Sequence, residues 1–384
     1  MSQIHYISLA ADLAKAVRVL SAAPVIAFDL EFDRDRFSYG FRLCLLQVAT
    51  PSDCFIIDPL AIKDLQPLYQ FFETSTARKL AHCPGEDLRL LHSLQCYPTH
   101  LCDTEIYAKL LNYEQTSLSN MLLQKCGVAL NKRWQTSNWA KRPLVEDQIL
   151  YAADDVIHLF GLEEELRKEA NAKGIQAYID EEQEVLSQTR YQLEPKTDFL
   201  KKSDRLYLSP YDQFVLNQLF KLRDQLAQRF NKPAHYIMPE ALVRDLWAEK
   251  VAIKELCASP GIYPALRKPG MQQEWERAWK QIHEAARQQG LSKKRQRKEL
   301  APGEPNGYQR RESAEAVKKE IFAPIQKWIA ERLGEQAMRV VLSSGAVSDI
   351  IQGDLKISAI RQPYRRQLIT EAAEALRISV QAWW

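Results

Sequence analysis

The alternation of strand-like and helix-like patterns over residues 1–175 is the feature that most limits how this chain can fold. Short apolar runs at residues 25–28, 42–49, 54–57 and 79–82 have the length and composition of β-strands. A turn at Pro51-Ser52 predicts that the second and third runs form a hairpin. Helical patterns follow at residues 64–72, 87–94, 104–111, 118–126 and 146–170. This order predicts an α/β domain with a mixed sheet flanked by helices.

The rest of the chain lacks strand patterns, and helical periodicity dominates from Leu206 onward. A length of 384 residues also exceeds what one hydrophobic core usually supports. We therefore expect several domains, which are an α/β domain at 1–175, a linker at 176–205, a helical domain at 206–288, a basic flexible linker at 289–313 and a second helical domain at 314–384.

Charge is distributed unevenly between the two halves. Residues 1–200 carry 20 Lys and Arg against 28 Asp and Glu, a net charge of −8. Residues 201–384 carry 32 against 21, a net charge of +11. Such a split indicates an acidic catalytic unit joined to a basic unit that meets a polyanion. The alternative is that two domains differ in charge without functional meaning.

The cysteines and the apolar segments indicate the cellular setting. The seven cysteines are scattered and never spaced C-x-x-C, which argues against a disulfide framework or a thiolate zinc site. No stretch approaches the roughly 18 apolar residues of a membrane span, and residues 1–20 do not have the pattern of a signal peptide. We expect a cytoplasmic protein with no membrane partner and no obligate protein partner.

Two carboxylates follow directly on the first apolar run. Asp29 and Glu31 are at positions i and i+2, so on a strand they share one face. A divalent cation would neutralise their repulsion, and oxygen ligands suit Mg²⁺ or Mn²⁺ rather than zinc. The alternative is a solvated acidic loop, because Asp33 and Asp35 continue the spacing. An EF-hand loop is excluded, since its sixth and twelfth positions would be arginine and glycine.

Three further residues extend this acidic set. Tyr151 and Asp155 are one turn apart in an apolar helical segment, so they share a face. Alternatively, Tyr151 is a packed aromatic whose hydroxyl simply bonds to Asp155. Asp87 follows a strand and the Pro84-Gly85 turn, where a carboxylate can also be a helix cap.

Together these residues resemble the three exonuclease motifs of the DEDD superfamily, tyrosine subtype: Asp29, Glu31, Asp87, Tyr151 and Asp155. The surrounding stretches are similar to the ribonuclease D family: DLEF at 29–32, HCPGEDL at 82–88, CDTEIYAKLL at 102–111 and NWAKRPLVEDQILYAADDV at 138–156. Asn131 and Val145 depart from that pattern, which puts local stability in doubt rather than the acidic set.

The resemblance implies a ribonuclease H-like fold and a 3′→5′ exoribonuclease that releases nucleoside 5′-monophosphates. It implies two Mg²⁺ or Mn²⁺ ions per site, held by Asp29, Glu31, Asp87 and Asp155. Asp29 would bridge both ions and Asp87 would hold the ion on the leaving-group side. Tyr151 would position the attacking water, because an ordinary tyrosine pKa near 10 makes it a poor general base. The implied partner is RNA, in particular the 3′ ends of tRNA precursors.

Five residues near these motifs are candidate RNA contacts: Phe32, Gln47, His82, Lys141 and Arg142. For Lys141 and Arg142 the alternative is simple solvation at the surface. His82 is unsuited to Mg²⁺, because histidine favours softer ions, and a structural hydrogen bond is its alternative role.

The helical half resembles HRDC domains, which are helical nucleic-acid-binding modules. The stretch LFKLRDQLAQRFNKPAHYIMPEALVRDLW at 219–247 carries the likeness for the first, and RVVLSSGAVSDIIQGDL at 339–355 indicates a degenerate second copy. Such modules, with the basic run at 293–298, would bind phosphates with little sequence preference. Two rival hypotheses remain open at this point, a DNA 3′→5′ exonuclease and a non-catalytic RNA-binding protein. P-loop and zincin motifs are absent from the sequence.

Overall fold

The computed structural model of the chain describes residues 2–295 and 307–384. It divides into two compact units. Unit 1 contains Met1–Glu31, Leu43–Leu193 and Leu300–Trp384, and unit 2 contains Phe32–Arg42 and Glu194–Glu299. Residues 296–298 of the predicted basic run, and residues 299–306 of the linker predicted around it, lie outside the described residues. No helix in the described part has the length and apolar character needed to cross a bilayer.

Unit 1 is organised around a six-stranded mixed sheet with the order β1-β4-β3-β2-β5-β6. Its strands are β1 (Gln3–Ile7), β2 (Val25–Arg34), β3 (Phe41–Ala49), β4 (Asp53–Ile57), β5 (Arg78–Ala81) and β6 (Leu101–Asp103). The pairs β1–β4, β2–β5 and β5–β6 are parallel, and β3 and β4 are antiparallel. The predicted mixed sheet and the predicted hairpin between the second and third runs are therefore confirmed.

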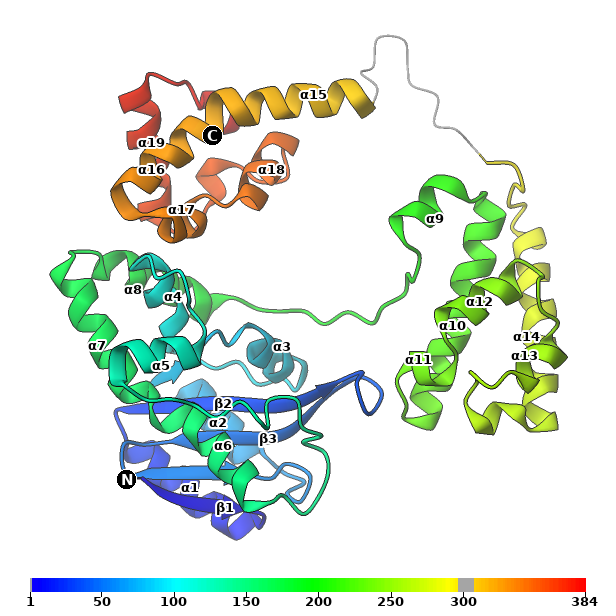
Figure 1. The fold of residues 1–384 in the computed structure, drawn as a ribbon, viewed down its shortest axis with the longest axis horizontal. Coiled ribbons are helices and arrows are strands. Elements are labelled where there is room, and N and C mark those ends of the chain that lie inside the picture. Colours follow the sequence, from blue (N-terminus) through cyan, green and yellow to red (C-terminus); the bar gives the residue numbers. More distant parts are fainter. Residues whose placement is uncertain (1, 296–306) are drawn as a thin grey trace. The chain divides into compact units, whose positions relative to one another are not determined.

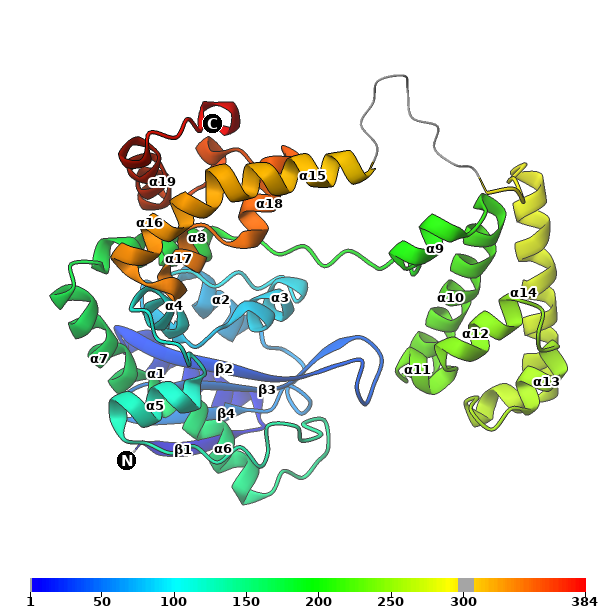
Figure 2. The ribbon, with the colours of Figure 1, turned by 45° about the horizontal axis from the view of Figure 1, so that its top comes forward.

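Helices cover both faces of this sheet (Figures 1 and 2). They are α1 (Ala10–Ala22), α2 (Gln66–Thr74), α3 (Gly85–Ser93), α4 (Thr104–Leu110), α5 (Leu118–Cys126), α6 (Glu146–Ile157), α7 (Leu159–Ala172) and α8 (Gln176–Gln188). Phe28 of β2 packs edge-on against Phe72 of α2, with ring centroids 5.3 Å apart. Ala27, its neighbour on β2, belongs instead to the core that contains Ala152 and Ala153 of α6. Because strand residues alternate between faces, α2 and α6 cover opposite sides of β2.

The structure departs from the sequence prediction in three places. The first strand and helix, β1 and α1, were not expected, nor was the three-residue β6. The helix expected at residues 146–170 is two helices, which meet at His158. The strand β2 continues to Arg34, well beyond its apolar run, so Asp29 and Glu31 lie inside a strand rather than after one.

The C-terminal helices share the core of unit 1. They are α15 (Gly307–Val317), η2 (Lys318–Phe322), α16 (Ala323–Leu333), α17 (Glu335–Val341), α18 (Ser344–Gln352), η3 (Ile357–Ala359), α19 (Pro363–Leu376) and η4 (Gln381–Trp383). Glu182 of α8 accepts hydrogen bonds from Gln362, from the Tyr364 hydroxyl and from two nitrogens of Arg365. This buried network fastens α8 to α19 inside one continuous apolar core.

Unit 2 has its own helical core. Its helices are α9 (Lys202–Tyr207), α10 (Pro210–Phe230), α11 (Ala234–Ile237), α12 (Glu240–Trp247), α13 (Ile253–Ala258), η1 (Pro264–Arg267) and α14 (Pro269–Gln288). Asn231 ends α10, in a left-handed conformation. The side chain of Asp204 on α9 pairs with two guanidinium nitrogens of Arg244 on α12, at 2.9 and 3.0 Å. The predicted helical character of this segment is therefore confirmed.

Candidate active site

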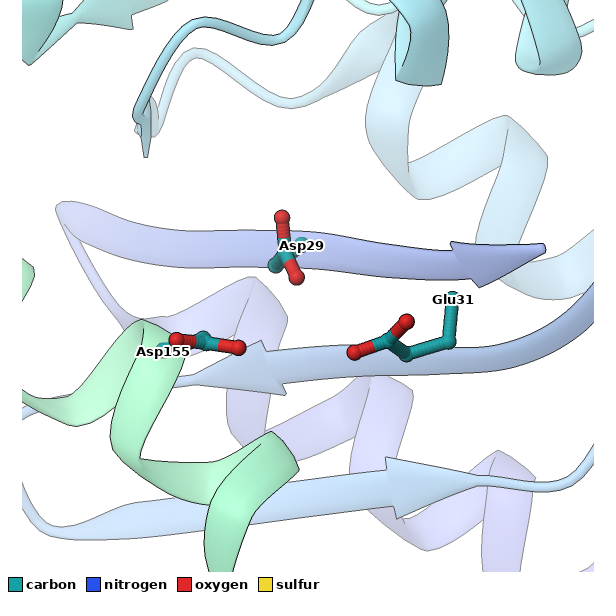
Figure 3. A group of neighbouring side chains, drawn as sticks. All are labelled: Asp29, Glu31 and Asp155. Carbon is teal, nitrogen blue, oxygen red and sulfur yellow. The ribbon is translucent and has the colours of Figure 1, made fainter. Parts of the chain in front are cut away.

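Asp29 and Glu31 lie on one face of β2, the face opposite to Phe28. Both side chains are half-buried. Figure 3 shows them on the side of the strand that α6 covers. The alternating pattern of β2 therefore places two acidic groups on one partly dehydrated surface, where the cost of burying charge is high.

Helix α6 brings Asp155 to the same surface. Oxygen atoms of Asp29, Glu31 and Asp155 all lie within 4.8 Å of one another. In Figure 3 the carboxyl groups of Glu31 and Asp155 are turned toward each other, with Asp29 beside them. Among the described residues this is the one group of three or more acidic, histidine or cysteine side chains that comes this close. The expected approach of Asp155 to Asp29 and Glu31, which are far from it in the sequence, is thus observed.

The start of α6 is held without a conventional cap. Val145 has no side-chain oxygen that could accept from the first turn, but the Gln148 side chain reaches back to the start of the helix. Its Oε1 accepts a hydrogen bond from the backbone nitrogen of Val145 at 3.1 Å, and its Nε2 donates to Ser137 at 2.7 Å. These two hydrogen bonds anchor the first turn of α6, the helix that carries Tyr151 and Asp155, although Val145 departs from the family pattern.

Asp87 lies in the first turn of α3 and is buried. It is not in the group of oxygens within 4.8 Å, but its charge acts on both Asp29 and Glu31. The turn before it is fixed by Asp103, whose Oδ1 accepts from the backbone nitrogens of Cys83 and Glu105, both at 2.8 Å. Sequence reasoning missed Asp103, although an aspartate directly before a helix is a common cap.

The four carboxyl groups all have raised pKa values. Burial, and then the charge of Asp87, raises the pKa of Asp29 well above its ordinary value. Burial and the charges of Asp29 and Asp155 do the same to the pKa of Glu31. Burial, followed by the charge of Asp29, raises the pKa of Asp155 to about 8, and burial raises that of Asp87 to about 7. Without a counter-ion these groups resist ionisation, which is the electrostatic property of a cation site.

Tyr151 stands beside this cluster, one helical turn before Asp155. Burial, and then the charge of Asp155, raises the pKa of the Tyr151 hydroxyl above its ordinary value of 10.0. The hydroxyl is therefore protonated at neutral pH. A protonated phenol donates or accepts a hydrogen bond, which suits the positioning of a water molecule rather than removal of its proton.

The structure reassigns two of the candidate RNA contacts to structural roles. The five N–H donors of Arg142 are all used, by Asp58 twice and by the carbonyls of Cys44, Trp139 and Lys141. Both ring nitrogens of His82 are also engaged, with the hydroxyl of Thr104 and the carbonyl of Thr116, each at 2.8 Å. Burial lowers the pKa of His82. The interpretation of Arg142 and His82 as RNA contacts is corrected accordingly.

The interpretation of Gln47 as an RNA contact is also corrected, because its side chain has no exposed surface and cannot reach a nucleic acid. Gln47 lies on β3, opposite Ile56 of β4, in the interior of the sheet. Phe32 is half-buried against Phe41, with ring centroids 5.0 Å apart, and Lys141 is exposed. A direct contact with RNA remains a prediction for Phe32 and Lys141.

Comparisons with known proteins agree with this geometry. The sequence profile of a family described as 3′-5′ exonuclease matches residues 4–171, the segment that contains all five motif residues. The ribonuclease D of Nitrobacter hamburgensis is 27% identical over 97% of this chain and 94% of its own length. The ribonuclease D of Zymomonas mobilis is 35% identical over 64% of each chain. The chain is a relative of ribonuclease D.

Solved structures support the same fold. Escherichia coli RNase D, described as an exoribonuclease involved in structured RNA processing, superposes with a TM-score of 0.71 at 22% identity, over 98% of this chain and 99% of that one. The catalytic core of RRP6 from Trypanosoma brucei gives a TM-score of 0.65 at 25% identity, over 76% of this chain and 81% of that one. The α/β domain followed by helical segments is thus the architecture of ribonuclease D, and the chain is an exoribonuclease of this type.

Proposed function

We propose that this ribonuclease D relative hydrolyses RNA from its 3′ end and releases nucleoside 5′-monophosphates at the carboxylates of β2, α3 and α6. The observation that carries the proposal is the convergence of Asp29, Glu31 and Asp155 within 4.8 Å, with Tyr151 next to them. Carboxylates that favour a divalent cation, beside a group able to position water, suit the hydrolysis of a phosphodiester.

The residues fit Mg²⁺ or Mn²⁺. The donors are carboxylate oxygens, and their raised pKa values reflect burial and mutual repulsion, both of which a bound cation would offset. In our proposal Asp29, Glu31 and Asp155 hold one ion, and Asp29 and Asp87 hold a second. When bound, such ions supply positive charge for the phosphate and lower the pKa of an attacking water. The protein holds the carboxylates in place through the rigid backbones of β2, α3 and α6.

Tyr151 orients the attacking water through its neutral hydroxyl. Its ring lies near Trp139, with centroids 5.9 Å apart, and its pKa keeps the proton on the phenol oxygen. A phenylalanine at this position would keep the packing and remove the hydroxyl. The proposed role therefore predicts that Tyr151→Phe lowers kcat with little change in fold stability.

RNA is the proposed substrate, and the 3′ ends of tRNA precursors are the proposed physiological target. The support comes from the relatives, which are ribonucleases by name, and from the basic helical segments after residue 200. The helical segments at 206–288 and 314–384 are proposed to act as HRDC-like modules that grip phosphates. Lys141 and Phe32 are proposed as additional RNA contacts, and the cytoplasm as the site of action.

One assay tests the proposal directly. A 5′-labelled RNA is incubated with Mg²⁺, with and without chelator, using the wild-type protein and Asp155→Asn. We expect stepwise 3′ shortening with nucleoside 5′-monophosphates as products, and loss of the activity with chelator or with the variant. Full activity of Asp155→Asn would reject the assigned site.

A matched single-stranded DNA in the same assay separates the ribonuclease from the rival DNA exonuclease. Faster release of mononucleotides from DNA than from RNA would reject RNA as the substrate. Binding of Mg²⁺ and RNA without release of mononucleotides would favour the rival non-catalytic binding protein.

A further inference from the structure

A hollow of about 120 Å³ opens directly beside Tyr151 and Asp155. Its other walls come from the first turn of α5 and from the segment between α5 and α6. The lining residues are Ser117, Leu118, Ser119, Leu130, Asn131, Lys132, Gln135, Tyr151 and Asp155. The hollow therefore shares a wall with the carboxylate cluster while most of its lining is not acidic.

Lys132 is the cationic side chain in this lining. It is exposed, and within the part of the chain that the structure describes it forms no ion pair. Its backbone carbonyl accepts from the nitrogen of Gln135 at 3.3 Å, and Asn131 Oδ1 accepts from the nitrogen of Arg133 at 3.0 Å. These bonds shape a turn that presents Lys132 and Gln135 to the same space.

Hydroxyl groups of the first turn of α5 also line the hollow. The Oγ atoms of Ser117 and Ser119 lie 3.4 Å apart, and the Ser117 side chain makes no capping hydrogen bond to α5. An ammonium group, an amide and two hydroxyls offer hydrogen-bond donors, whereas metal sites for hard cations need oxygen acceptors in larger number. The donor set matches a phosphate group.

The neighbouring cluster leaves a need for such a group. Cations bound at Asp29, Glu31 and Asp155 would serve the reacting phosphate, so the next phosphates of the RNA chain require a cationic partner of their own. We propose that Lys132, aided by Gln135 and Ser119, binds a backbone phosphate of the substrate RNA in this hollow and so places the 3′ end against Tyr151. This inference rests on the proposed exoribonuclease function and adds a positioning subsite to it.

The test separates substrate positioning from chemistry. With a short oligoribonucleotide as substrate, Lys132→Ala is expected to raise KM by about tenfold, the typical worth of one charge-assisted hydrogen bond, with kcat unchanged. The slope of log(kcat/KM) against log[salt] should fall by roughly 0.7, the value for one phosphate contact on a single strand. Lys132→Arg should restore most of the loss, and Gln135→Ala should raise KM less than Lys132→Ala.

The control is Lys15→Ala, which removes an exposed lysine on α1 that pairs with Asp12. It should match the wild type in KM and in salt slope. If Lys132→Ala also matches the wild type in both, or lowers kcat at constant KM, the subsite is refuted.

A binding measurement distinguishes failure of the subsite from failure of the proposed function. Affinity for the same oligoribonucleotide is measured by fluorescence anisotropy in chelator, where cleavage is expected to stop. Weaker binding by Lys132→Ala supports the subsite even if the wild type releases no mononucleotides, a result that would reject only the exonuclease activity. Equal binding by the variant and the wild type counts against the subsite.

Discussion

Replacing Arg142 with alanine should destabilise the protein rather than weaken its hold on RNA. The guanidinium bonds to both carboxylate oxygens of Asp58, with Nε at 2.7 Å and Nη2 at 2.8 Å, and to three backbone carbonyls. The Tyr6 hydroxyl donates to the same carboxylate at 2.6 Å. This cluster ties the segment before α6 to β3 and to the residue that follows β4, so Arg142 supports the site from a distance.

The magnitude follows from burial. The Asp58 side chain is 4% exposed and that of Arg142 is 23% exposed, so removal of the arginine leaves a nearly buried carboxylate without its partner. Breaking a buried pair in this way costs about 3–5 kcal/mol, and the partial exposure of Arg142 favours the lower value, about 3 kcal/mol. Arg142→Lys keeps the charge but loses the two-pronged geometry, and it should retain only part of the stability.

The assay is urea unfolding followed by tryptophan fluorescence, combined with steady-state kinetics under conditions where each variant is folded. Asp58→Asn and the double variant complete a mutant cycle, and their effects should be far from additive because the two residues are in contact. Unchanged stability of Arg142→Ala, together with a several-fold rise in KM for RNA, would refute this reasoning. It would instead support Arg142 as a contact to the RNA.

Three further predictions concern charge. Glu182→Gln should lower the free energy of unfolding by about 3 kcal/mol, because it removes the charged partner of Arg365 in the buried network. The control Glu184→Gln, at an exposed position, should change this free energy little, and urea unfolding of both variants measures the difference. The Mg²⁺ concentration that gives half-maximal nuclease activity should rise as the pH falls below about 8 and again below about 7. These are the pKa values of Asp155 and Asp87, below which protons compete with the cation for the carboxylates. A concentration that does not change with pH would contradict the ligand assignment. Burial lowers the pKa of His92 from 6.5 to about 4. Between these pH values the unfolded chain binds more protons than the folded protein, so the stability of the fold should fall as the pH drops from 6.5 to about 4. In thermal unfolding across that range, His92→Gln should lose stability less steeply than the wild type.

The sequence predicted the acidic set because strand and helix periodicity report which residues share a face. The i, i+2 spacing of Asp29 and Glu31 and the i, i+4 spacing of Tyr151 and Asp155 survive folding unchanged. Periodicity carries no information on the distance between separate elements. The approach of Asp155 on α6 to Asp29 and Glu31 on β2, with carboxylate oxygens within 4.8 Å of one another, was therefore predictable only from the family resemblance.

The elements and residues that the sequence did not predict correctly have identifiable physical causes. Residues 3–7 form β1 although they are mostly polar or partly exposed, because they pair with the buried β4 at the edge of the sheet. Arg142 looked like a surface arginine because its partner, Asp58, lies 84 residues away in the sequence. Gln47 follows a run of apolar residues in β3, and nothing in its local pattern reveals that both its faces are covered.

The joining of α8 to α19 by Glu182 makes the C-terminal helices an integral part of the nuclease body rather than a detachable appendage. The chain leaves this body after Leu193, forms the helices of the second unit and then returns to complete it. If the backbone were cut between Leu193 and Leu300, the two parts of unit 1 would stay associated without a covalent link. A split version of the protein, expressed as two polypeptides, should reassemble through the same buried carboxylate.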